Sequence, residues 1–403
     1  MRLFFLVFLL LSAQLAAQPT GWTIEAARDL LAAIEGASAH GLEPEDYGRG
    51  RLALALASPD PSAALIVAPD SFRRLATDYS EGRLGRTTRA GWRMSGQEMF
   101  PARLDALERE ALGRAGIPAV LDQLLPPFGQ YKALVTVLAA TPEADRETRD
   151  LLRVNLERWR WMPRQPGEAH ILVNVAAQEL VHVRPGLAPH RHRVIVGRPR
   201  TPTLQFSSTA SGVVLNPPWV VPRSIVRESI GPLIRSSPAT ARARGYSWSG
   251  SGSALSVTQA PGPQNALGHV KIEMPNPYSI FLHDTPNRAL FNRKDRALSH
   301  GCIRTQDVRD LAARMLEGVA GWDRARIDAV IDTRVTTLVP LERPLPVHIG
   351  YFTAEADREG RLLRHPDIYG RDAAILAALN GRHTGKPESE VLADAECRQP
   401  ARS

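Results

Sequence analysis

The sequence predicts an α+β protein with a helical first part and a mostly β second part. Apolar residues recur at helical spacing between positions 20 and 160. Near Met162 the pattern changes to short β-branched runs that are separated by Pro, Gly and Asn. We therefore expect a helical scaffold domain at residues 19–160, a mostly β mixed domain at residues 161–380 and a flexible tail at residues 381–403.

The start of the chain has the order of a secretory signal peptide. Met1 and Arg2 give a short positive start, residues 3–11 are an unbroken apolar run, and residues 12–17 are mostly small. The apolar run is too short for a stable membrane anchor, and no later stretch reaches the roughly 18 apolar residues that a spanning helix needs. We predict a signal peptide at residues 1–18 and an exported protein; a buried N-terminal helix is the alternative.

The first part contains a series of expected helices. Thr23 is a suitable N-cap for a helix that ends at His40 and Gly41. A later helix is expected to begin at Thr141, because Pro142 would then occupy the first helical position. Between these two helices the spacing predicts others at residues 71–79, 102–112 and 130–140.

The second part contains a series of expected strands with one long interruption. The strands are predicted at residues 170–175, 179–183, 193–197, 213–215, 279–283 and 346–352. Between Pro222 and Gly268 lie a helical piece, at residues 224–234, and a Ser- and Gly-rich stretch, at residues 246–255. Long insertions between the strands of a compact domain are often functional, so residues 223–262 are predicted to form a lid.

The charge balance restricts the class of partner. The net charge is +8, the pI is about 9.9, and only four of the basic residues are lysines. The sequence has no DNA-binding motif and no basic patch interleaved with aromatic residues, so nucleic acid is excluded as the expected partner. An anionic cell-wall polymer remains compatible with this charge.

One segment contains the residues for nucleophilic chemistry. An expected strand ends at His283, and the block from Ser299 to Arg304 places Ser, His, Gly, Cys and Arg within six positions. Cys302 is reactive only as a thiolate. We expect its pKa to be lowered by Arg304, by a nearby imidazole and by the N-terminus of a helix capped by Thr305.

The neighbouring residues supply the other functions of an acyl-transfer site. His283, at the end of a strand, is placed to accept the thiol proton. Ser299 is the expected residue that orients this imidazole. Gly301 allows close approach of the backbone, so that its N–H and that of Cys302 face a developing oxyanion.

These residues have three other possible interpretations. Cys302 as inert core packing is disfavoured by its polar neighbours. Zinc binding by His283, His300 and Cys302 lacks a supporting His-Glu-x-x-His or Cys-x-x-Cys motif, so no metal or other cofactor is expected. A Cys302–Cys397 disulfide would block the thiol. Two further histidines, His190 and His192, are expected to lie in an exposed turn rather than to bind a metal.

The block around Cys302 resembles the L,D-transpeptidase family with the YkuD-type catalytic domain. The family pattern is a His followed by Ser/Thr-His-Gly-Cys-x-Arg/Asn, and His283 with Ser299 to Arg304 matches it. The chain also resembles the larger, periplasmic YcbB-like branch of this family in the segments at residues 155–161, 216–222, 265–268, 276–278 and 367–372. The chain differs from many members of that branch because residues 140–151 leave no room for a peptidoglycan-binding module.

The resemblance implies a substrate and a reaction. Cys302 would attack the diaminopimelate carbonyl of a tetrapeptide stem in peptidoglycan and release D-Ala, and the amine of another stem would then resolve the acyl-enzyme. His283 would be the base, Ser299 its orienter, and His300, Gly301 and Cys302 the oxyanion region. The resemblance also implies a periplasmic location, a lid over the site with Trp219 and Tyr278 near the substrate, and acylation by carbapenem-type β-lactams.

The sequence leaves the acyl acceptor open. Water would make the protein a carboxypeptidase, a D-amino acid would give exchange, and a protein lysine would attach that protein to the wall. A non-catalytic wall-binding scaffold is the remaining alternative, although every candidate catalytic position is filled. Arg304 has two equal interpretations, as a ligand of a stem carboxylate or as a support for the loop.

Overall fold

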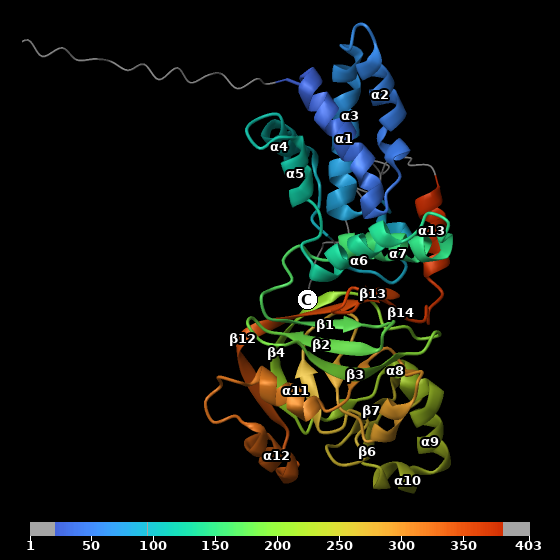
Figure 1. Ribbon diagram of the computed structural model, residues 1–403. Helices are drawn as coiled ribbons and strands as arrows, with labels where there is room; N and C mark the ends of the chain where they lie inside the picture. Colours follow the sequence, from blue (N-terminus) through green and yellow to red (C-terminus); the bar gives the residue numbers. More distant parts are fainter. Residues whose placement is uncertain (1–20, 95, 382–403) are drawn as a thin grey trace, which may run out of the picture. The chain divides into compact units, whose positions relative to one another are not determined.

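The computed structural model describes residues 21–94 and 96–381, and these residues form two compact units (Figure 1). The first unit contains the described residues up to Ser38, with Leu42–Tyr79 and Met99–Leu125. The second contains Ala39–Gly41, Ser80–Glu98 and the described residues from Pro126 onward. The predicted order, helical and then mostly β, is confirmed. The predicted signal peptide and Cys397 lie outside the described residues.

The first unit is a helical assembly around one apolar core. Its core includes Leu30, Ile34, Leu52 and Phe72, each fully buried. Thr23 caps the first helix as predicted, because its Oγ1 accepts a hydrogen bond from the N–H of Ala26 at 3.1 Å. The α-helices are α1 (Ile24–Gly36), α2 (Arg49–Ala57), α3 (Ala63–Glu81), α4 (Pro101–Ala111) and α5 (Ile117–Gln123).

Several helix boundaries differ from the sequence prediction. Helix α1 ends at Gly36 rather than at His40 and Gly41, and a short 3-10 helix follows it (Ala37–His40). Helix α3 contains Pro69 and begins well before the predicted range of 71–79, since the prediction started after this helix-disfavouring residue. In the second unit, α6 (Gly129–Ala140) is followed by α7 (Arg146–Arg160). Helix α7 is capped by Asp145, whose Oδ1 accepts from the N–H of Thr148 at 3.1 Å. The predicted cap at Thr141 is wrong, because its hydroxyl donates to the carbonyl of Val137 instead.

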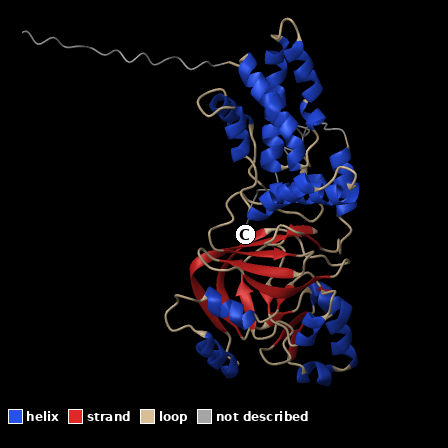
Figure 2. Cartoon of the chain, viewed as in Figure 1, coloured by secondary structure: helices blue, strands red, loops and turns tan. Residues whose placement is uncertain are grey.

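The second unit is built on one large sheet, which Figure 2 shows in red. Its strand order is β10-β3-β11-β9-β8-β4-β12-β1-β2, and an additional pairing between β2 and β3 closes it on itself. A closed sheet leaves no edge between those strands to pair with another chain. The strands are β1 (His170–Asn174), β2 (Glu179–Val183), β3 (His190–Gly197), β4 (Ser207–Leu215), β8 (Val270–Glu273), β9 (Leu282–His283), β10 (Ala297–Ser299), β11 (Ile303–Thr305) and β12 (Thr337–Gly350).

The enclosed face of this sheet is apolar, and short helices cover one part of it. Residues in register on neighbouring strands project to the same face of the sheet. On the inward face the following side chains are fully buried: Ile171, Val194, Val213, Ile272, Leu282, Ile303 and Val347. Helix α11 (Val308–Met315) adds Leu311 and Ala312 to the buried set. The remaining elements are α12 (Arg324–Thr333), the hairpin β13 (Ala354–Ala356) and β14 (Leu362–Arg364), and α13 (Asp372–Asn380).

The long interruption between β4 and β8 is a small subdomain with its own core. Val221, Val226, Ile234, Ala241 and Val257 form that core. Its elements are β5 (Trp219–Val220), α8 (Arg223–Ile225), a π-helix (Val226–Ile230), α9 (Gly231–Ser236), α10 (Pro238–Ala243), β6 (Tyr246–Ser249) and β7 (Ser256–Gln259), with strand order β5-β7-β6. Figure 1 shows α8, α9 and α10 grouped beside β6 and β7.

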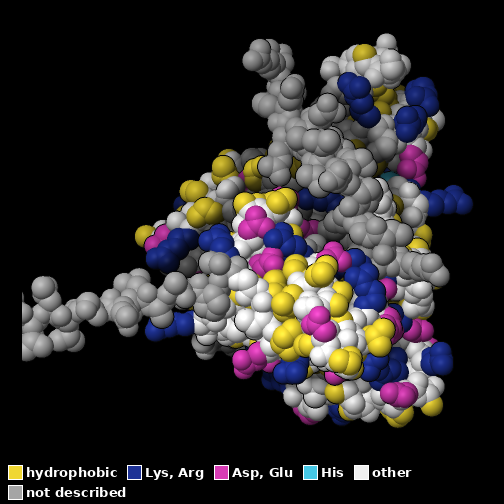
Figure 3. Space-filling model, turned by 90° about the horizontal axis from the view of Figure 1, so that it is seen from above, with side chains coloured by type: hydrophobic (Ala, Val, Ile, Leu, Met, Phe, Trp, Pro, Cys, Tyr) yellow, Lys and Arg dark blue, Asp and Glu magenta, His cyan; other side chains and the backbone are white. Residues whose placement is uncertain are grey.

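One face of the molecule carries both signs of charge. On the face drawn in Figure 3, Lys and Arg side chains alternate with Asp and Glu side chains rather than forming one basic surface. Among the described residues, no helix combines the length and the apolar character that crossing a membrane requires.

Candidate active site

Three adjacent strands bring the predicted catalytic residues together. Lys271 on β8 is in register with His283 on β9, and His283 is in register with Arg304 on β11. Because residues in register share a face, these three side chains project to the same side of the sheet. Cys302 precedes Arg304 by two positions and therefore belongs to this face as well. The opposite face at these positions is the apolar interior.

The sulfur of Cys302 lies in a partly exposed position at the start of β11. Its Sγ–H donates to the carbonyl oxygen of Ser279 at 3.4 Å. Burial raises the pKa of the thiol, while the N–H of Phe281 and the positive charges of Arg304 and Lys271 act in the opposite direction. Burial is the largest of these effects, so the pKa of the thiol lies above its ordinary value, which favours the protonated form.

Sequence reasoning missed how the loop beside Cys302 is held. Ser279 has a φ of 54°, an unusual left-handed conformation for a non-glycine residue. The side chain of Asn276 fixes this loop: its Oδ1 accepts from the N–H groups of Tyr278 and Ile280, and its Nδ2 donates to the carbonyl of Ile280 at 2.8 Å. Asn276 therefore places the carbonyl that holds the thiol proton. The Asn-Pro turn signal in the sequence marks this loop, but it does not reveal the contact.

His283 is buried, with 4% of its surface exposed, and it has the tautomer of a general base. Its Nδ1 lies 2.6 Å from the carbonyl oxygen of Asp284, so Nδ1 carries the proton of the neutral ring and Nε2 is its basic nitrogen. A hydrogen bond to the backbone of Leu267 also holds the ring. Burial lowers the pKa of His283 to about 4, and the charge of Arg304 contributes in the same direction. The imidazole is therefore neutral at pH 7. No hydrogen bond between described residues joins it to Cys302, so proton transfer requires the thiol to leave Ser279.

The structure gives Ser299 a different contact from the predicted one. Its Oγ donates to the carbonyl of Cys302 at 2.6 Å and accepts from the N–H of Gly301 at 3.0 Å. The hydroxyl thus braces the turn before the nucleophile, and the carbonyl of Asp284 orients His283 instead. Gly301 has a φ of 116°, which only glycine adopts readily. Because its N–H is bonded to Ser299, the N–H of Cys302 is the better candidate oxyanion donor.

His300 connects the nucleophile turn to the inserted subdomain. Its Nε2 lies 2.7 Å from a guanidinium nitrogen of Arg198 and 3.0 Å from Oε2 of Glu228, which is in the π-helix. Arg198 and Glu228 form an ion pair at 2.7 Å, and hydrogen bonds from Arg198 and then His300 lower the pKa of Glu228. One nitrogen cannot serve both neighbours at once: unprotonated Nε2 accepts from Arg198, whereas protonated Nε2 donates to Glu228.

The expected helix N-terminus next to Cys302 is wrong. Thr305 belongs to β11, and α11 begins at Val308 with Asp307 as its N-cap. Three strand residues at about 3.3 Å each place the helix start about 10 Å or more beyond the nucleophile. The field of a helix terminus falls off within about one turn, so it does not activate this thiol.

The three predicted substrate-binding residues lie in different environments. The side chain of Arg304 has no ion pair with a described residue, and burial lowers its pKa. The ring of Tyr278 packs against Phe206 with ring centroids 4.9 Å apart. Trp219 packs against the core of the inserted subdomain. Arg304 is therefore the charged group that remains available to a substrate carboxylate.

The predicted location of His190 and His192 is wrong. Both residues lie in β3 rather than in an exposed turn, and His192 is only 4% exposed. The alternating pattern His-Arg-His-Arg-Val-Ile-Val is a strand signal that the Pro before it obscured.

Two family models match parts of this chain. Residues 168–335 match the family model described as L,D-transpeptidase catalytic domain (YkuD), and residues 18–138 match the model described as Scaffold domain. A Haemophilus influenzae protein named "Putative L,D-transpeptidase" is 36% identical over 249 residues, which are 57% of this chain and 50% of that protein. The chain thus spans half the length of this relative.

Similar solved structures are also L,D-transpeptidases by title. One is from Mycobacterium smegmatis (15% identity, TM-score 0.25, covering 45% of this chain and 58% of that chain). Another is L,D-transpeptidase 1 of Mycobacterium tuberculosis (17% identity, TM-score 0.23, covering 45% and 60%). The two family matches identify residues 168–335 as an L,D-transpeptidase catalytic domain of the YkuD family, preceded in the chain by a scaffold domain.

Proposed function

We propose that this protein is an exported peptidoglycan L,D-transpeptidase that uses Cys302 as its nucleophile. The observation that carries the proposal is the shared face of β8, β9 and β11, where Cys302, His283 and Arg304 project together. A thiol, a neutral imidazole and an available guanidinium are the groups that acyl transfer to and from a carboxyl-bearing peptide requires.

The first half-reaction forms a thioester. Cys302 Sγ attacks the diaminopimelate carbonyl of a tetrapeptide stem while Nε2 of His283 takes the thiol proton. The Cys302 N–H donates to the oxyanion of the tetrahedral intermediate. Collapse breaks the C–N bond, and His283 returns the proton to the departing amine of D-Ala. Arg304 would bind a carboxylate of the stem.

The second half-reaction transfers the acyl group to an amine. The side-chain amine of another stem attacks the thioester, His283 accepts its proton, and the sulfur leaves as a thiolate that is then reprotonated. The product is a direct cross-link between two diaminopimelate residues. Water, a D-amino acid or a protein lysine could instead attack and resolve the same thioester.

The inserted subdomain is proposed to act as a lid over residues of this site. Glu228 from its π-helix bonds to His300, which is two residues before the nucleophile. π-helical turns are frequent at functional sites, because they break the regular pattern of a helix. The contact gives the subdomain a direct link to the nucleophile turn.

The acyl-enzyme can be tested by intact mass after exposure to a tetrapeptide muropeptide or to a carbapenem. The parent protein is expected to gain the mass of the acyl group, and Cys302→Ala is expected to gain none. An adduct that survives in Cys302→Ala would reject this nucleophile. Muropeptide analysis of sacculi after overexpression then tests the acceptor, since an absence of diaminopimelate cross-links would remove the transpeptidase version.

The base can be tested with two histidine variants. His283→Ala is expected to lose much more acylation rate at neutral pH than His300→Ala, because the imidazole of His283 projects from the same face of the sheet as Cys302 and is held by the carbonyl of Asp284. The reverse ranking would reassign the base.

A further inference from the structure

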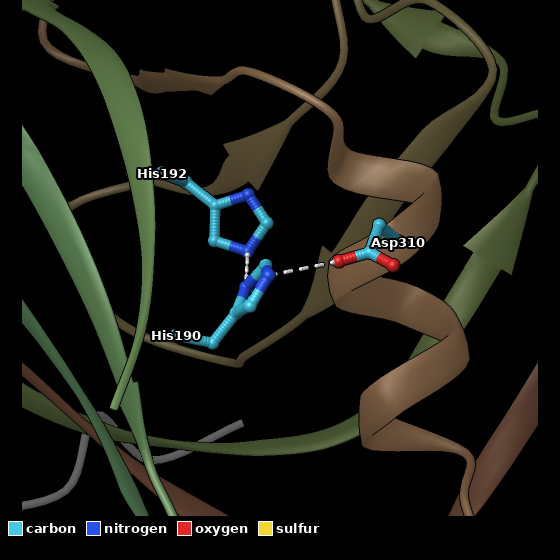
Figure 4. Close-up of side chains that lie close together, drawn as sticks. All are labelled: His190, His192 and Asp310. Atoms are coloured by element: carbon cyan, nitrogen blue, oxygen red, sulfur yellow. Dashed lines mark hydrogen bonds and ion pairs between the residues drawn. The ribbon is translucent and has the colours of Figure 1, made fainter. Parts of the chain in front are cut away.

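A second cluster of ionisable groups lies between β3 and α11, on the opposite face of the sheet from Cys302. His190 and His192 extend from β3, and Asp310 extends toward them from α11 (Figure 4). We propose that His190, His192 and Asp310 bind a divalent transition-metal ion, for which Zn²⁺ is the best fit. Two imidazoles and a carboxylate are ordinary ligands of zinc.

The tautomer of His192 prepares it as a ligand. Its Nδ1 lies 2.9 Å from the carbonyl oxygen of Gln306, which only accepts, so Nδ1 carries the proton. The other nitrogen, Nε2, therefore presents a lone pair toward Nδ1 of His190, 2.9 Å away. Hydrogen bonding of the non-ligating nitrogen to a backbone carbonyl is the usual way in which proteins orient a metal-binding imidazole.

The two other ligands complete a compact triad. His190 Nε2 lies 3.3 Å from Oδ2 of Asp310, and Arg314 holds that carboxylate through a hydrogen bond of 3.0 Å. One ligand atom from each residue lies within 4.8 Å of the others. Tetrahedral zinc with ligands at about 2.0–2.1 Å separates ligand atoms by about 3.3 Å, so the side chains must move closer to bind an ion. His190 faces His192 with Nδ1 and Asp310 with Nε2, and it would bind the ion through one of these nitrogens after its ring rotates. Binding would displace the proton shared between His190 and His192.

The surroundings of the triad support a ligand there. His182 on β2 is in register with His190, so both imidazoles share a face of the sheet. It is 3% exposed, and its Nδ1 has no hydrogen-bond partner among the described residues. Three histidines on the otherwise apolar enclosed face are costly unless their nitrogens are satisfied. A bound ion with its water molecules would satisfy nitrogens that the protein leaves incompletely paired.

The triad is accessible to an ion from solvent. His190, His192 and Asp310 line a cavity of about 400 Å³, and the side chains of His190 and Asp310 are 33% and 38% exposed. The coordination position that the protein does not fill would face this cavity and hold water.

The inferred role of the ion is structural. Strand β3 pairs with β11, where Arg304 is in register with Ile195, and α11 follows β11 through Gln306. An ion bound by residues of β3 and α11 would join these two elements. Strand β11, which begins next to Cys302, pairs with β3 and leads into α11, so the ion would stabilise its position.

The proposal can be tested by titrating the full chain, without a histidine tag and after treatment with a chelator, with Zn²⁺ by calorimetry. We expect one site per chain in a Cys302→Ala background, where the nucleophile cannot contribute. Asp310→Asn keeps the shape of the side chain and is expected to weaken binding at least tenfold; His190→Gln with His192→Gln is expected to weaken it at least a hundredfold. His170→Gln, in β1 outside the cluster, is the matched control and should bind like the parent.

Two further measurements keep the result interpretable. Zn²⁺ should raise the Tm of the Cys302→Ala protein but not that of its Asp310→Asn derivative, and circular dichroism checks that each variant is folded. Co²⁺ should give visible bands of a nitrogen and oxygen site without thiolate absorption in the ultraviolet. The proposal is overturned if Zn²⁺ does not bind, if the Asp310 and histidine variants bind as tightly as the parent, or if His170→Gln alone loses binding.

Discussion

The ionisation of Cys302 provides the sharpest test of how this site works. An ordinary cysteine with a pKa near 8.5 is only about 3% thiolate at pH 7. Burial raises the pKa of Cys302 beyond its ordinary value, so its thiolate population should be smaller still. A cysteine activated by a helix N-terminus would instead have a pKa between about 3.5 and 7.5 and be largely ionised. The two cases predict different pH profiles for the free enzyme.

The contribution of Arg304 can be worked out from strand geometry. Residues two positions apart on a strand lie about 6.6 Å apart, which gives about 2.5 kcal/mol between unit charges at an effective dielectric constant of 20. Partial exposure and solvent screening reduce this to about 1 kcal/mol. Arg304→Gln should therefore lower the thiolate population, and with it the alkylation rate below the pKa, by about fivefold.

The assay is the rate of alkylation by iodoacetamide between pH 6 and 10, followed by intact mass. The midpoint for the parent is expected above about pH 8.5, and Arg304→Gln should move it upward. Arg358→Gln, at an exposed position distant in sequence, is the matched control and should leave the profile unchanged. A midpoint below pH 7, or equal rates for the parent and Arg304→Gln, would refute the account of a thiol whose pKa is raised by burial and lowered by Arg304.

Three other predictions follow from named contacts. Glu228→Gln removes one partner of a half-exposed ion pair that stabilises the protein by up to about 1 kcal/mol. Hydrogen exchange in residues 223–262 should therefore rise by up to about fivefold. Unchanged exchange would show that Glu228 does not hold the inserted subdomain in place. Asn276→Ala leaves the N–H of Ile280 without its acceptor. The variant should be acylated by a carbapenem more slowly, while its far-ultraviolet circular dichroism spectrum stays unchanged. A normal rate would show that this loop does not position the thiol. His283 has a pKa of about 4 when folded and about 6.5 when unfolded, so its contribution to stability is present above pH 6.5 and is lost as pH falls toward 4. This amounts to about 2 kcal/mol at pH 5, and thermal unfolding of His283→Gln should show a weaker loss of stability over that range.

The sequence alone determined the fold class and predicted a candidate nucleophile. Helical and strand periods are local properties, so they separate the scaffold part from the β part without any tertiary information. The block from Ser299 to Arg304 places a thiol among polar groups, which core packing does not explain. These conclusions needed only spacing and residue type.

The tertiary structure decided how the site residues interact. The sequence could not show that β11 separates Cys302 from helix α11, because both a cap at Thr305 and a short strand fit those residues. It could not show that the carbonyl of Asp284, rather than Ser299, orients His283, because backbone groups leave no mark in the residue pattern.

The same limitation hid the histidine cluster. His190 and His192 precede a short strand signal, and Asp310 is more than a hundred positions later in the chain. Strand register and the packing of α11 bring them together, and neither property can be calculated from local preference. The sequence therefore supplied the chemical groups, while long-range pairing determined which groups meet and how their surroundings shift their pKa values.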